Sequence, residues 1–236
     1  MKLIDICGLA IIPAKTDSTR LKKKNLRIIA GKTLVEHAID YAKNSELIKY
    51  IIVTTESDEV REIVRKYDNI LLYDRKESYM GEREVADVYV NVLQNLIREN
   101  HEQQNDIVDK ISHVVGVQPD HPDRQTNADE LLKYAVVNKY DDLVTVDSSG
   151  TRNGAVRVTK KEFVESGMMS RRIGSYLDDC TNIHSEEDLK QAEKNITNIN
   201  TRLSSAEATW QMAENLYRQL ADQVREHDYD IKDLNR

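Results

Sequence analysis

Strand-like apolar runs alternate with helix-period segments through the first two thirds of the chain. The five predicted strands are residues 9–13, 50–55, 69–73, 113–118 and 142–146. Helix starts follow several of them, as at Thr33 with Glu36, at Ser57, and at Thr126 with Asp129. This alternation indicates βαβ units and therefore a doubly wound α/β fold with a mainly parallel sheet. A chain of 236 residues is long enough for one such domain with a sizeable core.

Basic residues crowd the segment between the first predicted strand and the first predicted helix. They are Lys15, Arg20, Lys22, Lys23, Lys24 and Arg27. Cations this close repel one another unless they are solvated or neutralised, and a triphosphate would neutralise them. The alternative is a solvated surface turn. Ligands of parallel sheets bind at the carboxyl ends of the strands, where this loop and residues 118–120 both fall, so the ligand site is favoured.

Composition excludes several other classes of function. The chain has 34 Lys and Arg against 41 Asp and Glu, a net charge of −7, which argues against nucleic-acid binding over an extended basic face. No apolar run approaches the roughly 20 residues of a membrane span, and the N-terminus lacks a secretory layout. Cys7 and Cys180 lie far apart without metal-ligand spacing. We therefore expect a cytoplasmic protein with neither nucleic-acid nor membrane partners.

The last part of the chain has a different pattern. Apolar residues there keep an unbroken spacing of three and four, at Leu203, Ala206, Trp210, Ala213, Tyr217, Leu220 and Val224. Such a heptad pattern predicts a long helix that either packs on its own domain or pairs with a partner subunit. We predict a nucleotide-binding domain over residues 1–200 and a heptad-patterned helix over residues 201–236. The unbroken phase favours a homodimer.

Several ordered motifs resemble the cytidylyltransferases that activate acylneuraminic (sialic) acids and the related CMP-KDO synthetases. They lie at residues 11–18 with 24–26, 31–34, 53–60, 117–122, 153–156 and 185–189. The resemblance covers roughly residues 8–195 and implies a Rossmann-like nucleotidyltransferase fold. It also implies transfer of CMP from CTP to a sugar acid, with release of pyrophosphate.

The resemblance assigns roles to residues of the basic loop and of the fourth strand. It implies catalytic roles for Lys15, Lys24 and Asp120, with Asp120 binding Mg²⁺ or Mn²⁺ as cofactor. The nucleotide-binding residues that it implies are Ala14, Lys15, Ser18, Lys24, Asn25 and Gln118. Lys15 stands where the family normally has arginine, which keeps the charge and loses the bidentate fork.

Acceptor binding is assigned to Asn153 and Arg157 by the same resemblance. Arg152, Arg171 and Arg172 lie in the same segment, and the guanidinium fork suits the carboxylate of a sugar acid. The sequence does not name the acceptor.

One departure from the family pattern concerns the metal site. Asn182 and His184 stand where the family has a pair of aspartates, and both are poorer ligands for magnesium. Asp178 and Asp179 are the nearby carboxylates that could replace the pair. Two alternatives therefore stay open. One is a nucleotidyltransferase with another base or another acidic acceptor, such as a phosphonate. The other is a non-catalytic nucleotide-binding homologue.

Overall fold

The computed structural model describes residues 5–16, 18, 20–75, 85–102, 106–167 and 172–234, with side chains as far as residue 215. The chain divides into two compact units, Met1–Glu193 and Lys194–Arg236. Arg171 and the side chains of Tyr217, Leu220 and Val224 lie outside the described part.

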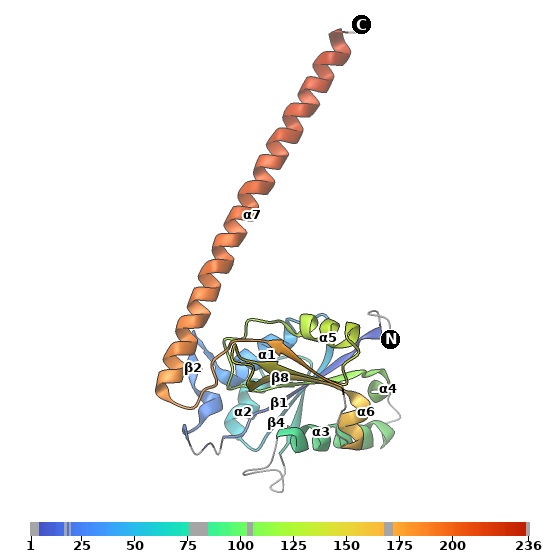
Figure 1. Cartoon of the computed structure of the whole chain (residues 1–236), viewed down its shortest axis with the longest axis vertical. Helices are drawn as coiled ribbons and strands as arrows, with labels where there is room; N and C mark the ends of the chain where they lie inside the picture. Colours follow the sequence, from blue (N-terminus) through green and yellow to red (C-terminus); the bar gives the residue numbers. More distant parts are fainter. Residues whose placement is uncertain are drawn as a thin grey trace. The chain divides into compact units, whose positions relative to one another are not determined.

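Seven of the described strands form one sheet in the order β5-β4-β1-β6-β8-β7-β9 (Figure 1). Their bounds are β1 Gly8–Pro13, β4 Ile48–Thr55, β5 Ile70–Asp74, β6 His113–Val117, β7 Asp142–Val146, β8 Arg152–Lys160 and β9 Ile173–Leu177. Neighbouring strands are parallel except at β8, which is antiparallel to β6 and to β7. The predicted doubly wound, mainly parallel sheet is confirmed.

Helices cover both faces of this sheet (Figure 1). α1 (Leu34–Lys43), α2 (Asp58–Val64) and α5 (Ala128–Val137) contribute to the apolar core on one face. α3 (Val85–Glu102), α4 (Ile107–Lys110) and α6 (Lys161–Ser166) contribute to the core on the other. Successive residues of β1 alternate between the two cores, Ala10 and Ile12 facing one and Leu9 and Ile11 the other. This burial on both faces explains why the strand reads as a continuous apolar run.

Two of the three predicted helix starts are confirmed. The Thr33 hydroxyl accepts the Glu36 N–H, completing a capping box with the Glu36 carboxylate, and Ser57 caps α2. The prediction that Thr126 caps α5 is wrong by one residue. Asn127 accepts the Glu130 N–H at 2.8 Å instead, because the Thr126 hydroxyl donates to the buried carboxylate of Asp178 at 2.5 Å.

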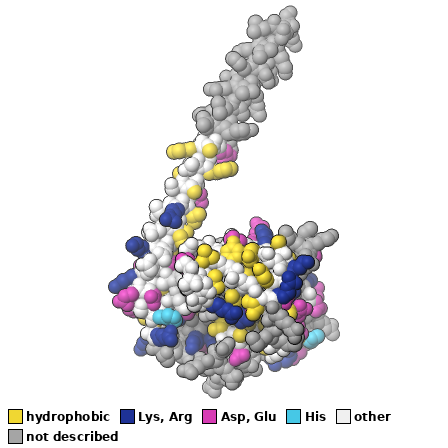
Figure 2. Space-filling model, viewed as in Figure 1, with side chains coloured by type: hydrophobic (Ala, Val, Ile, Leu, Met, Phe, Trp, Pro, Cys, Tyr) yellow, Lys and Arg dark blue, Asp and Glu magenta, His cyan; other side chains and the backbone are white. Residues whose placement is uncertain are grey.

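A single long helix, α7 (Glu186–Leu234), begins in the first unit and makes up the described part of the second. The predicted division after residue 200 falls within it. Apolar side chains stand out along its described part (Figure 2). Leu203 and Trp210 of this helix are exposed. No described helix, α7 included, combines the length and the apolar character needed to cross a membrane.

His113 begins β6 and is held in one tautomer by its neighbours. The Ser112 hydroxyl accepts the Cys7 N–H at 2.9 Å and donates to the Cys7 carbonyl at 3.1 Å. Its only proton is therefore used, so His113 Nδ1, 3.0 Å away, must be the donor in its bond to Ser112. Burial, helped by the charge of Lys160, lowers the pKa of His113 to about 4. The folded protein therefore holds His113 neutral at neutral pH.

This burial predicts a pH dependence of stability. The pKa of His113 is lower in the folded chain than the value of about 6.5 in the unfolded chain, so the unfolded chain binds the extra proton first. Stability should fall as pH drops from about 6.5 to about 4, by up to about 3 kcal/mol at 1.36 kcal/mol per pKa unit. His113→Asn keeps a donor for Ser112 and should lose less stability over this range. Urea unfolding at pH 7, 5.5 and 4 measures the difference, and parallel curves for the two proteins would contradict the assignment.

Candidate active site

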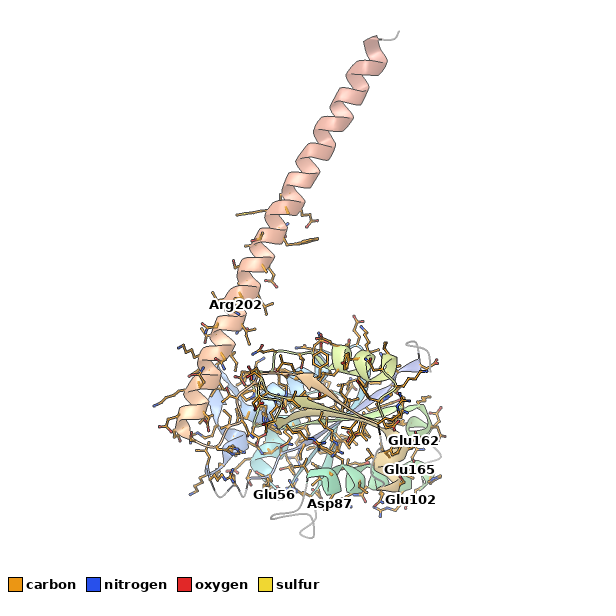
Figure 3. The ribbon with its side chains drawn as sticks, in the orientation of Figure 1. Glu56, Asp87, Glu102, Glu162, Glu165 and Arg202 are labelled. Atoms are coloured by element: carbon orange, nitrogen blue, oxygen red, sulfur yellow. The ribbon has the colours of Figure 1, made fainter. Side chains whose placement is uncertain are left out.

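The basic loop leaves β1 and is fastened to the end of the neighbouring strand β4. The Ala14 N–H donates to the Thr54 carbonyl at 2.9 Å, and the Thr55 hydroxyl donates to the Ala14 carbonyl at 2.7 Å. The N–H and the hydroxyl of Thr16 both donate to Glu56 Oε1, at 2.6 and 3.0 Å. Glu56, labelled in Figure 3, follows β4 directly. The loop is thereby held at the carboxyl ends of two parallel strands.

The far side of the loop returns to the same place through Asn25. This residue lies in a short 3₁₀ turn, Lys24–Leu26, which the left-handed backbone of Lys23 introduces. The Asn25 side chain is buried, and its Nδ2 donates to the Lys15 carbonyl at 2.7 Å. Asn25 thus fixes the backbone that carries Lys15. Ser18 is half-buried in the same loop.

Lys24 and Asp120 form an ion pair at the centre of this edge of the sheet. Lys24 Nζ lies 2.6 Å from Asp120 Oδ2 and also donates to the Ile183 carbonyl at 3.2 Å. Both side chains are largely shielded, at 15% and 16% exposed. Burial raises the pKa of the Asp120 carboxyl, but the neighbouring His121 and Lys24 outweigh it and hold that pKa well below its usual range. The pair and the bond to the Ile183 carbonyl therefore join three segments of the chain.

The third of these segments, residues 182–184, is fastened to Asp120 through the backbone. The Ile183 N–H donates to the Asp120 carbonyl at 2.9 Å, and the Ile183 side chain is fully buried. The Asn182 Oδ1 atom is buried and has no hydrogen-bond partner among the described residues. The ring Nδ1 of His184 lies 3.4 Å from an Arg20 nitrogen. Burial, with the charges of Lys24 and Arg20, lowers the pKa of His184.

The two nearby aspartates that could replace the metal-binding pair differ in how far they are already used, Asp178 being buried and Asp179 exposed. Asp178 is buried and accepts hydrogen bonds from the Gln125 N–H and the Thr126 hydroxyl, so its role is structural. Asp179 accepts the Ser148 N–H at 3.2 Å. No group of three or more His, Cys, Asp or Glu side chains that could hold a metal occurs in the described part of the chain. The Asp120 carboxylate, which also contacts Lys24 and His121, is the oxygen donor of the type that Mg²⁺ prefers, and the Asn182 amide oxygen is a weaker one.

A cavity of about 170 Å³ opens beside Gln118, between the end of β6, the first half of β8 and the start of α3. Its polar lining comes from Gln118, Arg152 and Arg157, and Tyr89 of α3 contributes an aromatic wall. Gly154 also lines it, with φ +77°, and a Cβ there would lie 3.1 Å from Gln118 Nε2. A glycine is therefore needed both for the backbone turn and for the Gln118 side chain.

Of the predicted acceptor residues, Arg157 faces this cavity and Asn153 is committed elsewhere. Arg157 is 38% exposed and forms a fork with buried Asp142, at 2.9 Å from Nε and 2.6 Å from Nη2. The Asn153 amide donates to the Asp178 carbonyl at 2.6 Å and accepts from the Thr145 hydroxyl at 2.6 Å and the Ala155 N–H at 3.1 Å. Asn153 thus shapes the turn beside the cavity, and its contact with an acceptor stays a prediction.

Comparison with known proteins shows which family the chain belongs to. The family model described as cytidylyltransferase matches residues 9–201. The chain belongs to the cytidylyltransferase family. The match includes the basic loop, the Lys24–Asp120 pair and the cavity.

Individual relatives of the cytidylyltransferase family match shorter stretches. A CMP-N,N'-diacetyllegionaminic acid synthase of Legionella pneumophila is 32% identical over 128 residues, which are 54% of this chain and 51% of the relative. A pseudaminic acid cytidylyltransferase of Campylobacter jejuni is 29% identical over 115 residues, 48% of this chain and 47% of the relative. The chain thus matches about half the length of these relatives.

The fold itself recurs in solved structures. A cytidylyltransferase from Leptospira borgpetersenii superposes with a TM-score of 0.57 at 14% identity, covering 84% of this chain and 95% of the other. At this level of identity the likeness concerns the fold.

Two residues that the sequence patterns did not single out also shape this candidate site. An Arg124 nitrogen donates to the carbonyls of Gln118 and Ala155, and its guanidinium lies 5.1 Å from the centre of the Tyr41 ring. Tyr89 is buried against Gly116, where an added Cβ would lie 2.2 Å from the Tyr89 ring. The glycine inside an apolar strand was the available signal, because it marks a close approach of another group.

The ion pair predicts how the loss of Lys24 will act. Lys24→Met should weaken CTP binding roughly 10- to 100-fold, the usual value of a hydrogen bond to a charged group. It should also destabilise the fold, because the shielded Asp120 carboxylate loses a partner. Calorimetric titration with CTP and thermal unfolding measure the two effects.

The double variant Lys24→Met with Asp120→Asn separates the effect on CTP binding from the effect on stability. It should recover much of the stability, since the unpaired charge is gone, without recovering the CTP affinity. Unchanged CTP affinity in Lys24→Met would remove Lys24 from the nucleotide site.

Proposed function

We propose that this member of the cytidylyltransferase family transfers CMP from CTP to a sugar acid and releases pyrophosphate. The observation that carries the proposal is the shielded Lys24–Asp120 pair, held between the basic loop and residues 182–184. Beside it lies a cavity lined by two arginines, the side chains best suited to a carboxylate. The matching relatives named for legionaminic and pseudaminic acid support a sugar acid as the acceptor.

The reaction needs an attacking oxygen in line with the α-phosphorus and cations around the leaving group. The acceptor hydroxyl forms the new P–O bond while the bond to pyrophosphate breaks, and the hydroxyl proton leaves to solvent or a nearby base. Lys15 and Lys24 neutralise the charge that builds on pyrophosphate, and Ser18 donates to a phosphate oxygen. Ala14, Asn25 and Gln118 hold the backbone and the nucleotide in position. Lys24 can turn from Asp120 to the phosphates without losing a charged partner.

The proposed cofactor is Mg²⁺, or Mn²⁺, entering with the triphosphate. Magnesium commonly takes one or two protein oxygens and otherwise water and phosphate. Asp120 would supply the carboxylate, and the Asn182 amide oxygen, which has no hydrogen-bond partner among the described residues, is a second candidate donor from the segment bonded to the Asp120 backbone. The ion would neutralise charge on the pyrophosphate as it leaves.

The acceptor is expected in the cavity beside Gln118. Arg152 and Arg157 would bind its carboxylate, with Arg157 already oriented by its fork to Asp142. The partners proposed are therefore CTP and a small acidic sugar, with a second copy of the chain in a homodimer. The location proposed is the cytoplasm, where free cysteines such as Cys7 and Cys180 stay reduced.

Pyrophosphate release tests the proposal. The protein is assayed with CTP, UTP or ATP, with Mg²⁺ or Mn²⁺, and with sialic-, legionaminic-, pseudaminic- and KDO-type acids and a phosphonate. We expect turnover with CTP and one of the sugar acids. Turnover with the phosphonate alone would show that the acceptor is a phosphonate and not a sugar acid. CTP binding without any turnover would identify a non-catalytic homologue.

A substitution at Arg152 should change the KM of one substrate and leave the KM of the other nearly unchanged. Arg152→Gln removes a charged donor from the cavity wall and should raise the KM for the acceptor roughly tenfold or more, as expected for a charged hydrogen bond. The KM for CTP should stay within about twofold. Arg98→Gln, on the exposed side of α3, is the matched control and should change neither value. An acceptor KM unchanged in Arg152→Gln would place the acceptor elsewhere.

The metal proposal has a test that does not depend on turnover. Bound Mn²⁺ is followed by electron paramagnetic resonance with CTP and protein present. Asp120→Asn should weaken Mn²⁺ binding to the protein–CTP complex at least tenfold, because a carboxylate becomes an amide. Equal Mn²⁺ binding in both proteins would show that the triphosphate alone holds the ion.

A further inference from the structure

The apolar stripe of α7 is longer than the sequence segment that first revealed it. Among the described side chains, the alternating spacing of three and four runs through Leu189, Ala192, Ile196, Ile199, Leu203, Ala206, Trp210 and Ala213. The sequence keeps the same phase to the end of the helix, through Tyr217, Leu220, Val224, Ile231 and Leu234, with one polar residue at His227. An unslipped heptad repeat of this length is the pattern of a coiled coil.

The apolar stripe is buried at the N-terminal end of α7 and exposed to solvent further along the helix. Leu189 and Ala192, within the first unit, are buried. Leu203 is 57% exposed and Trp210 is 73% exposed. The described part of the second unit is this one helix, so it offers no other element to cover the stripe. A row of exposed large apolar side chains marks an interaction surface.

The length of the helix argues against its own domain as the cover. At 1.5 Å per residue, the span from Lys194 to Leu234 is roughly 60 Å long. A compact unit of the size of Met1–Glu193 has a radius of gyration of about 16 Å and hence a diameter of roughly 42 Å. A straight helix therefore extends beyond what such a unit can cover. A second helix with the same repeat can cover the whole stripe.

Charges beside the stripe select both the partner and its direction. With Leu203 and Trp210 at a positions and Ala206 at d, Arg202 is a g residue and Glu207 an e residue. In a parallel, in-register pair, each g residue lies beside the e residue five positions later on the other helix. Arg202, labelled in Figure 3, would then meet Glu207 of the partner subunit, and the reverse pair forms by symmetry. An antiparallel pair would bring e residues together, and Glu207 and Glu214 are both acidic.

We propose that α7 forms a parallel, in-register two-stranded coiled coil with α7 of a second copy, from about Ile196 onward. The proposal deepens the homodimer proposed above by naming its surface and direction. A parallel pair carries the two catalytic units at the same end of the coiled coil. Because the pairing uses only α7, it is independent of whether the catalytic proposal is correct.

Mass measurement by light scattering tests whether the stripe is the interface. The full chain should be a dimer, and Leu203→Glu with Trp210→Glu should be a monomer at the same concentration, with dimer affinity at least 100-fold weaker. Met212→Glu is the matched control, because Met212 is also 73% exposed and lies off the stripe; it should stay dimeric. A monomeric wild type, or a dimer that survives both glutamates, would overturn the proposal. CTP affinity should be equal in all of these proteins, which separates this test from that of the nucleotide site.

Direction and register are tested by disulfide formation. Ala206→Cys and Ala213→Cys are each prepared alone, seven residues apart at d positions. Mild oxidation should cross-link both variants in a parallel, in-register dimer. An antiparallel dimer would cross-link at most one of them, which would overturn the proposed direction. Ala208→Cys, on the outer face of the helix, and the wild type with its two native cysteines are the controls and should stay uncross-linked.

The charged pair allows a rescue experiment. Arg202→Glu alone and Glu207→Arg alone should each weaken the dimer several-fold at low salt, since like charges then face each other. The double variant restores opposite charges across the parallel seam and should recover the wild-type affinity. Failure of the double variant to recover, with both single variants weakened, would overturn the proposed register.

Discussion

The ion pair between Lys24 and Asp120 is the contact on which the rest of the site depends. It joins a loop after the first strand, the end of the central strand β6, and the segment that leads into α7. Each partner is shielded, so removing either one leaves a charge at this depth with less compensation. Because Lys24 also bonds the Ile183 carbonyl, the pair fixes the spacing of all three segments.

The sheet puts these segments in one place. β1, β4 and β6 are parallel neighbours, so the loops that follow them lie along one edge. The antiparallel strand β8 then brings residues from much later in the chain beside β6, with Arg157 opposite Gly116. Gly116 leaves room for Tyr89, and the Tyr89 side chain lines the cavity. Backbone topology thus brings the basic loop and the cavity to the same edge of the sheet.

Residues 182–184 carry less negative charge than the matching segment of the resembling enzymes. Where the resembling enzymes carry two aspartates, this chain has Asn182 and His184. The buried Asp178 already accepts hydrogen bonds from the Gln125 N–H and the Thr126 hydroxyl. Asp120 is the carboxylate that Lys24 contacts. The Ile183 N–H bonds to the Asp120 carbonyl, which ties residues 182–184 to the end of β6.

The sequence by itself determined the parallel sheet, the capped starts of α1 and α2, the basic loop and the heptad phase of the last helix. These follow from local patterns: period-two and period-3.6 burial, capping hydroxyls and adjacent charges. Only the tertiary structure decided which polar groups already have hydrogen-bond partners within the protein. The amide of Asn153, the carboxylate of Asp178 and the Thr126 hydroxyl bond to partners that their own sequence positions do not reveal. Long-range pairing assigns those donors and acceptors, and it left Lys24 and Asp120 facing each other across 96 residues of chain.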